Sequence, residues 1–414
     1  MHTAPIFGYL LLIVVSTTSL ANAENWPRYR GSDGSGVSRE KGFPTTWKLE
    51  DYEWAVDLPG EGHSSPAIWD RHLFVTTATD GGRTRLLMCL DATTGKTKWS
   101  RPAEFQVNPK HEMNSFASSS PATDGERVYV AFADEQNYDL AAYDFEGNRV
   151  WKNSLGPFLS RHGHAASPIV FEDLVIIPND QDGPSWIVAY DRRNGNRVWT
   201  TPRLAREASY ATPLIVERPG SKPQLICVSG ASGVTSFDPW SGATNWSTAA
   251  LPARTVASPT YAFGLIYAIC GQGGKGVRMI GVDPTGAGDV DATHVKFIRE
   301  KEIPYVPAAV ATDDSLFLLT DGGILICIDP ATQKTRWQQR IGGKFFGSPI
   351  CLDGKLYCIE EKGKVVVVDT GKEFRLLGEN PIGDPSYSTP AVANGRLFLR
   401  SFHRLASLRS KLAE

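Results

Sequence analysis

Two histidines and two aspartates form the sharpest cluster of chemically active side chains in this sequence. His162 and His164 precede Pro168, and Asp180 and Asp182 follow in the next predicted loop. Side chains at i and i+2 of an extended segment point the same way, so two imidazoles could face two carboxylates across a metal ion. The spacing is not diagnostic of any metal family, and polar residues on the surface or along a channel are the simpler interpretation. We predict no metal here and keep these four residues as the candidate ligands.

A second set of residues, aromatic and polar, precedes a series of prolines. Aromatic faces with a few hydrogen-bond donors suit a funnel for a small ligand, a peptide or a protein segment. The alternative is that the rings only fill a channel. No catalytic or cofactor-binding residue is predicted. The nine candidates for binding, called the predicted rim below, are His63, Phe116, His162, His164, Tyr210, Arg254, Tyr305, Phe346 and Tyr387.

These residues can meet only if the fold brings the prolines together. Each proline follows a small residue and opens a unit of about 45 residues. Within a unit, short β-branched and aromatic runs alternate with tight turns, and no helical periodicity is sustained. Four strands per unit of this length make one propeller blade, so the sequence predicts an all-β, eight-bladed β-propeller of four-stranded antiparallel blades. The eight steps are Ser65-Pro66, Ser120-Pro121, Ser167-Pro168, Thr212-Pro213, Ser258-Pro259, Val306-Pro307, Ser348-Pro349 and Thr389-Pro390.

The phrase Asp-x-x-x-Gly-x-x-x-Trp recurs late in the units, as in Asp191-Gly195-Trp199. We expect the aspartate to accept backbone N–H groups, the glycine to supply positive φ, and the tryptophan to fill the wedge between adjacent blades. These residues therefore hold the ring together and bind nothing. The phrase is rewritten in blade five, over Asp283 to Phe297, and in blade seven, and a further insertion runs from Arg101 to Phe116. Such irregularities are usually tolerated insertions and less often the working face.

The last unit stops without an Asp-Gly turn or a tryptophan. A spare strand with a tryptophan, Tyr52 to Val56, precedes the first unit. We predict that this N-terminal strand is the outer strand of blade eight and closes the ring, which removes an exposed sheet edge.

The first residues resemble an export signal. An apolar run from Ile6 to Val15 precedes Ala21-Asn22-Ala23, a small-x-small cleavage site, and is too short to span a bilayer as a helix. We divide the chain into a signal peptide (1–23), an N-terminal extension (24–46) and the propeller (47–414). No cysteine follows the run, so we expect an exported protein, periplasmic or extracellular, that is not lipid-anchored.

Composition constrains the partners. The chain has 43 lysines and arginines against 45 aspartates and glutamates, a net charge of −2. This balance gives no electrostatic footprint for nucleic acid, and we expect a monomer without a transmembrane segment. Six cysteines all lie in apolar β-like runs, which favours reduced core thiols. Across the Asp353-Gly354 turn, Cys351 is predicted to face Leu356 rather than Cys358.

The segment from Leu90 to Trp99, Leu-Asp-Ala-Thr-Thr-Gly-Lys-Thr-Lys-Trp, resembles the blades of pyrroloquinoline-quinone (PQQ) repeat propellers. That superfamily holds quinone-dependent dehydrogenases and also non-enzymatic propellers such as BamB, the scaffold lipoprotein of the outer-membrane β-barrel assembly machinery. The dehydrogenases carry adjacent cysteines over the cofactor and a catalytic Asp with Glu and Asn ligands to calcium. This sequence has no Cys-Cys pair and no recognisable segment with that ligand set. It also lacks the lipidated cysteine of BamB, and Asn25 to Gly31 resembles the opening of many secreted bacterial PQQ-repeat proteins.

The resemblance leaves two functions open. The first is an exported, non-enzymatic propeller that binds a protein, a peptide or a small ligand at its channel face, with outer-membrane protein assembly as one setting. The alternative is a PQQ-dependent dehydrogenase with a divergent site for PQQ and calcium. We predict the first, and no cofactor.

Overall fold

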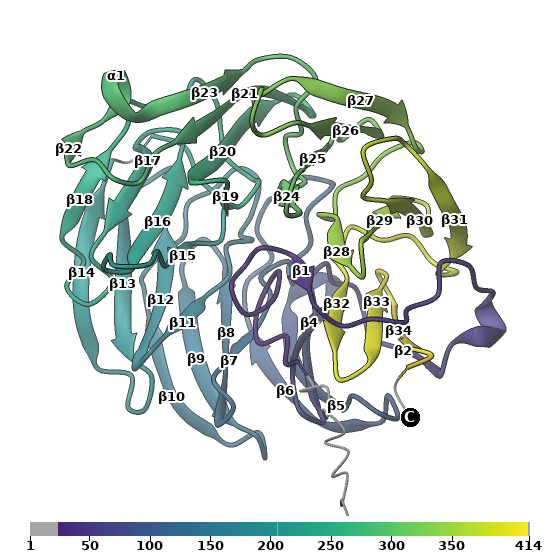
Figure 1. Ribbon diagram of the computed structural model, residues 1–414. Helices are drawn as coiled ribbons and strands as arrows, with labels where there is room; N and C mark the ends of the chain where they lie inside the picture. Colours follow the sequence, from purple (N-terminus) through teal and green to yellow (C-terminus); the bar gives the residue numbers. More distant parts are fainter. Residues whose placement is uncertain (1–23, 205, 413–414) are drawn as a thin grey trace, which may run out of the picture.

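A computed structural model describes residues 24–204 and 206–412, so the predicted signal peptide lies outside the described residues. Eight antiparallel β-sheets stand around a central channel (Figure 1). Within the described ranges, helix is confined to one short α-helix, α1 (Asp291–His294), and two 3-10 turns, Leu49–Asp51 and Asp80–Gly82. The architecture confirms the predicted eight-bladed propeller.

The first four blades follow the chain, with the innermost strand first. Blade one is β3 (Ala67–Trp69), β4 (His72–Thr79), β5 (Thr84–Asp91) and β6 (Thr97–Glu104). Blade two is β7 (Ala122–Thr123), β8 (Arg127–Ala133), β9 (Tyr138–Asp144) and β10 (Arg149–Ser154). Blade three is β11 (Ile169–Phe171), β12 (Leu174–Asn179), β13 (Ser185–Asp191) and β14 (Arg197–Arg203). Blade four is β15 (Leu214–Val216), β16 (Gln224–Ser229), β17 (Gly233–Phe237) and β18 (Thr244–Ser247).

The remaining blades complete the ring. Blade five is β19 (Thr260–Ala262), β20 (Leu265–Gln272), β21 (Lys275–Val282) and β23 (Val295–Arg299). Blade six is β24 (Val310–Ala311), β25 (Leu316–Leu319), β26 (Ile324–Ile328) and β27 (Thr335–Arg340). Blade seven is β28 (Ile350–Leu352), β29 (Lys355–Glu360), β30 (Lys364–Asp369) and β31 (Leu376–Pro381). Blade eight is β32 (Ala391–Ala393), β33 (Arg396–Arg400), β34 (Arg404–Arg409) and β2 (Trp54–Asp57).

The middle strands are apolar on both faces because a neighbouring blade covers each face. Val365 to Val368 of β30 are all fully buried, which is the pattern of a strand packed on both sides. All six cysteines are buried and free. Cys351 pairs in register with Leu356, as predicted.

The small-residue-plus-proline steps form a chain of hydrogen bonds between blades. The Ser65 N–H donates to Ser120 Oγ at 2.9 Å, and the Ser120 N–H donates to Ser167 Oγ at 2.9 Å. The same bond links Thr212 to Ser258 and Ser348 to Thr389, each at 2.9 Å. Each hydroxyl therefore satisfies the backbone of the preceding blade beside the channel. Blade six carries Val306 at this position and has no hydroxyl to offer.

Most of the repeated tryptophans pack on the turn of the next blade, as the wedge hypothesis requires. The indole N–H of Trp99 donates to the carbonyl of Phe145 at 2.7 Å, and that of Trp151 to the carbonyl of Arg192 at 3.0 Å. The repeated glycine lies under the ring. A Cβ at Gly195 would come within 2.8 Å of Trp151, so the glycine is needed for the close approach as well as for its φ of 74°.

The N-terminal strand closes the ring. Strand β2 pairs antiparallel with β34, with Trp54 opposite Ser407. The Trp54 indole donates to the carbonyl of Ala92 in blade one at 3.1 Å. Blade eight therefore contacts blade one through the same tryptophan–turn bond that joins blades one to four in succession, and the predicted closure is confirmed.

The segment before β2 threads into the ring (Figure 1). Trp26 forms an isolated bridge with Ile68 of blade one, and β1 (Val37–Ser38) adds to blade seven in parallel beside β28. Between them, fully buried Arg30 donates to the carbonyl of Ala309 in blade six at 2.5 Å. Contacts with blades on several sides of the ring place this segment across the channel as a plug. We call residues 24–38 the N-terminal plug.

The rewritten turn of blade five also becomes structural. Strand β22 (Gly288–Asp289) adds in parallel to β18 as a fifth strand of blade four.

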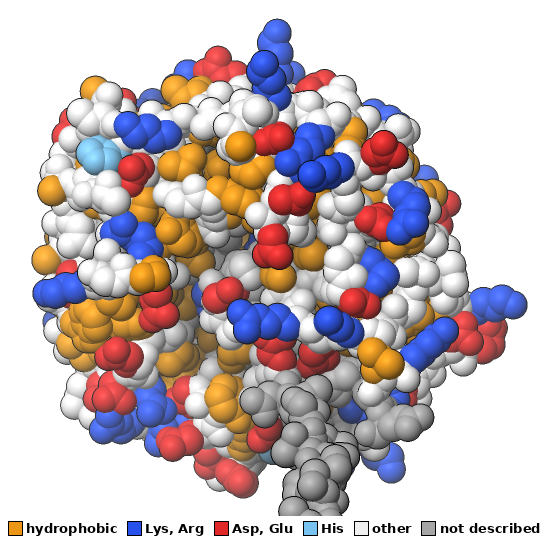
Figure 2. Space-filling view, viewed as in Figure 1, with side chains coloured by type: hydrophobic (Ala, Val, Ile, Leu, Met, Phe, Trp, Pro, Cys, Tyr) orange, Lys and Arg blue, Asp and Glu red, His pale blue; other side chains and the backbone are white. Residues whose placement is uncertain are grey.

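Figure 2 shows acidic and basic side chains interspersed on the visible face, in agreement with the near-neutral composition. Within residues 24–204 and 206–412, no helix is long and apolar enough for a membrane span.

Candidate functional site

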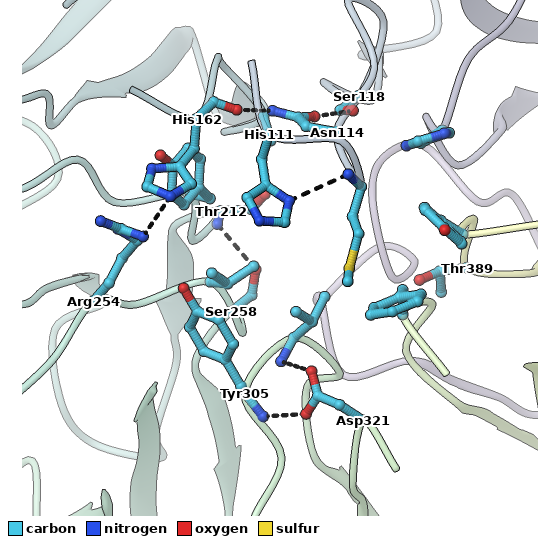
Figure 3. A pocket seen from close by; sticks show the side chains of 18 of the residues that line it. His111, Asn114, Ser118, His162, Thr212, Arg254, Ser258, Tyr305, Asp321 and Thr389 are labelled. Carbon is cyan, nitrogen blue, oxygen red and sulfur yellow. Dashed lines mark hydrogen bonds between the residues drawn. The ribbon is translucent and has the colours of Figure 1, made fainter. Parts of the chain in front are cut away.

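A cavity of about 410 Å³ occupies the channel mouth on the face of the loops that enter the inner strands (Figure 3). It is lined by loops from blades all around the ring, so no single repeat contains the site. Seven of the nine predicted rim residues line it: His63, His162, Tyr210, Arg254, Tyr305, Phe346 and Tyr387.

The N-terminal plug contributes to the cavity wall from within the channel. Tyr29 lines the cavity, and its hydroxyl lies 3.0 Å from Ser348 Oγ. Around it stand the hydroxyl groups of the inter-blade chain, including Ser120, Thr212 and Ser258. The lining therefore combines aromatic rings with many small donors and acceptors, a composition typical of ligand pockets.

On the side of blades three to five, a guanidinium is held by two partners. Arg254 Nη2 lies 2.7 Å from Glu207 Oε1, and Arg254 Nη1 lies 3.2 Å from His162 Nε2. Burial, with the nearby charge of Arg254, lowers the pKa of His162 to about 4, so its imidazole is neutral and accepts the guanidinium N–H. The Tyr210 hydroxyl lies 2.9 Å from Ser160 Oγ. The positive charge on this side is already paired.

On the side of blades seven, eight and one, aromatic rings gather with carboxylates. The rings of Phe346 and Tyr387 are 4.5 Å apart, and those of His63 and Tyr387 are 4.9 Å apart. The Tyr387 hydroxyl donates to Glu361 at 3.0 Å. Burial and the charges of Glu361, Glu112 and Glu61 together raise the pKa of Tyr387 to about 12. The phenol is therefore protonated, and its surroundings are electronegative.

Blade six places a buried carboxyl in the cavity wall. Asp321 accepts the backbone N–H of Tyr305 at 2.6 Å and that of Val306 at 3.1 Å (Figure 3). It thus satisfies the Val306 N–H, whereas at Ser65 and Ser120 the equivalent N–H is bonded to a hydroxyl of the following blade. Burial raises its pKa to about 6, against the lowering effect of the two backbone hydrogen bonds. Sequence reasoning missed Asp321, which belongs to none of the repeated motifs.

The insertion between blades one and two reaches over the cavity. His111 to Asn114 line it, and the His111 ring stacks on His162 at 5.4 Å between centroids. Asn114 Nδ2 donates to the His162 carbonyl at 2.7 Å (Figure 3). The sequence marked Arg101 to Phe116 as an irregularity, and these residues belong to the channel face.

Two predicted rim residues lie elsewhere. Phe116 packs against the guanidinium of Arg85, 5.2 Å from the ring centre, beneath the insertion. His164 is buried between blades, with Nε2 3.0 Å from the Tyr138 hydroxyl. Gly163, at φ 83°, turns the chain between the two histidines, so His162 faces the cavity and His164 faces the core. The expectation that both point the same way, which assumed an extended segment, is wrong.

The proposed metal ligands do not converge. Asp180 is buried in an ion pair with Arg203 at 2.7 Å. The Asp182 carboxylate accepts the backbone N–H groups of Arg161 and Ala208 instead. In the part of the chain that the structure describes, no three His, Cys, Asp or Glu side chains are grouped to hold a metal ion.

Comparisons with known proteins agree on the architecture. A family model described as "Outer membrane protein assembly factor BamB" matches residues 45–209, 183–290 and 292–374. No curated protein gives a significant sequence match. Among solved structures, the quinohemoprotein alcohol dehydrogenase from Comamonas testosteroni superposes with a TM-score of 0.71 at 13% identity, covering 92% of this chain and 80% of that one.

Other solved structures share the fold. BamB from Moraxella catarrhalis superposes with a TM-score of 0.64 at 16% identity, covering 87% of this chain and 98% of that one. Sqt1 from Saccharomyces cerevisiae gives 0.63 at 9% identity, with 87% and 99% covered. At these identities the likeness shows the fold alone.

Proposed function

Because this chain belongs to the family of PQQ-repeat propellers described as outer membrane protein assembly factor BamB, we propose that it is an exported, non-enzymatic binding module that seats a small ligand or a peptide side chain in the channel mouth. The observation that carries the proposal is the cavity of about 410 Å³, which the protein's own N-terminal plug enters from within the channel. A cavity that is closed at its inner end can bind a compact group, whereas a channel open at both ends would not hold one.

The pKa values of the lining side chains favour a binding role over a catalytic one. Three tyrosines of the lining, Tyr210, Tyr305 and Tyr387, have a raised pKa, with burial as the largest cause. His63 and His162 have a lowered pKa, again with burial first. Neither set is prepared to exchange protons near neutral pH. These groups offer fixed hydrogen bonds and ring faces to a ligand.

The residues present do not fit PQQ. That cofactor is a tricarboxylate, and Glu112 and Asp321 of the lining are themselves acidic. The arginine of the described lining, Arg254, is bonded to Glu207. Like charges confined in a site of low dielectric repel each other strongly. We therefore propose that the ring was retained without the quinone. A bound chromophore and dye reduction after incubation of the protein with PQQ and Ca²⁺ would overturn this part of the proposal.

The setting of the module follows from the family. A BamB-like propeller among exported proteins suggests a protein partner. Such a partner could place one of its side chains in the cavity. Outer-membrane protein assembly is the setting that the family description favours. We propose that the protein acts there as a monomer.

A cavity-filling variant tests the binding function. Ala165 lines the cavity, and Ala243 is exposed in the turn after Gly242. N-acetyl amides of acidic, basic, aromatic and neutral amino acids are titrated against wild type, Ala165→Trp and Ala243→Trp, with binding followed by ligand-observed NMR. We expect at least one class to bind wild type and Ala243→Trp saturably and to lose binding to Ala165→Trp. Equal binding to all three proteins, or to none, would refute the proposal.

A further inference from the structure

Four carboxylates stand at or beside the cavity, against two cations near His63, Lys110 and Arg400. Glu112 and Asp321 line it, Glu361 is bonded to the lining residue Tyr387, and Glu61 lies 3.3 Å from the lining residue His63. Burial lowers the pKa of His63, so this imidazole is not a counter-charge near neutral pH. The whole molecule carries only −2. The negative charge at the cavity is therefore a local feature, which average composition hides.

The electronegative half of the cavity also presents ring faces. Phe346 and Tyr387 line it edge to face at 4.5 Å, and Phe402 supports Tyr387 from behind at 4.8 Å. Aromatic faces attract cations through their quadrupole, and more strongly where water is excluded. The same half therefore combines two independent features, carboxylates and aromatic faces, that attract positive charge.

Asp321 is a buried carboxyl without a cationic partner among the described residues. It is only 5% exposed, and its carboxylate accepts two backbone N–H groups. A carboxylate in such a place is costly unless a positive charge approaches it. Its position in the cavity wall means that a ligand could supply that charge.

Resting on the proposed function, we propose that the cavity selects a cation: the guanidinium or ammonium group of a basic side chain or amine, seated between Asp321 and the Phe346–Tyr387 pair. Arg254 on the opposite wall does not compete for an anion, because Glu207 neutralises it at 2.7 Å. The partner segment would then present an arginine or a lysine to the channel mouth.

Two nearly isosteric probes isolate the charge. N-acetyl-arginine amide and N-acetyl-citrulline amide have nearly the same shape, and only the first is cationic. We expect the arginine probe to bind wild type at least about tenfold more tightly, since one desolvated charge contact contributes on the order of 1–2 kcal/mol. Equal affinity for the two probes would overturn the inference. If an acidic or neutral class binds in the binding test instead, the proposed binding function is supported and the proposed selectivity for a cation is refuted.

Variants locate the seat. Asp321→Asn should weaken arginine binding about fivefold or more and leave citrulline binding nearly unchanged. Because Asn cannot accept both backbone N–H groups equally well, Glu361→Gln provides a second charge deletion outside the buried wall, with the same direction expected. Glu146→Gln, an exposed residue in the blade-two turn after Asp144, is the matched control and should change neither probe. Loss of both probes together in Glu361→Gln, or no selective loss in either cavity variant, would contradict the assignment.

Discussion

At the residue scale, the repeated tryptophan and the repeated glycine act as a pair across two blades. Trp54, Trp99, Trp151 and Trp199 each donate to a carbonyl in the turn of the following blade. Trp246 precedes the rewritten turn of blade five and bonds Gln224 of its own blade instead. Blade five carries Phe297 where other blades carry the tryptophan, and the turn of blade six has Gln333 in place of the glycine. The positive-φ glycine is thus retained in the turns under Trp54, Trp99, Trp151 and Trp199, whereas Trp337 donates to the rewritten turn of blade seven.

Substitution of one such glycine tests this coupling. Gly195→Ala should reduce the free energy of unfolding by about 2–4 kcal/mol, because strain at positive φ adds to overpacking against Trp151. Gly288→Ala is the matched control, since Gly288 has a similar φ of 69° and no described atom lies within 4 Å of the place a Cβ would take. It should cost about 1–2 kcal/mol. Urea denaturation measures both, and equal losses would argue against the packing role of the tryptophan.

Asp321 predicts a pH dependence of stability. Its pKa in the folded protein is about 6, above the value near 4 of an unfolded aspartate. The folded state therefore holds an extra proton between these values, and the stabilising effect of that proton is lost as pH rises from about 4 to 6. The groups packed on this carboxyl are the amides of Tyr305 and Val306, with the Tyr305 phenol nearby.

Histidines with a lowered pKa, His162 and His164, act in the opposite direction over the same range, so the contribution of Asp321 must be measured as a difference. The stability of wild type minus that of Asp321→Asn should fall by about 2 kcal/mol from pH 4 to pH 7. Chemical denaturation across this range provides the measurement. A difference that does not vary with pH would show that Asp321 titrates normally.

At the element scale, the N-terminal residues do two separate jobs. Strand β2 completes blade eight, and the plug crosses the channel and brings Tyr29 to the cavity. The insertion after blade one adds His111 to Asn114 from the other side. The elements that depart from the repeat therefore finish the ring and shape the site.

Deletion of Glu24 to Leu58 should lower the melting temperature by more than about 10 °C. It removes four residue pairs with β34, the wedge of Trp54 and the buried contacts of Arg30, and several kcal/mol correspond to shifts of this size. Calorimetry and sedimentation of the truncated protein measure the stability and the expected aggregation at the exposed edge. A truncated protein of unchanged stability and solubility would refute the closure role. Deletion of residues 24–38 alone, which leaves β2 in place, separates the plug from the closing strand.

At the scale of the whole molecule, the ring gathers eight distant loops around one cavity. Tyr305, Phe346 and Tyr387 come from different blades and line one site. The proline steps of the sequence predicted seven of the residues that line the cavity, because a fixed repeat places equivalent loops at equivalent positions. They could not predict His164 or Phe116, since one glycine in a turn and one neighbouring insertion decide where those side chains point.

The sequence by itself determined the number of blades, the four-stranded pattern, the tryptophan wedges and the closing strand. These follow from turn chemistry and strand periodicity, which act over a few residues and are repeated along the chain. Only the tertiary structure decided that the N-terminal plug crosses the channel, that Asp321 accepts the backbone N–H groups of the loop entering blade six, and that carboxylates and aromatic rings share one half of the cavity. Those features depend on side chains far apart in sequence, whose burial and charge are set by the neighbours that the closed ring gives them.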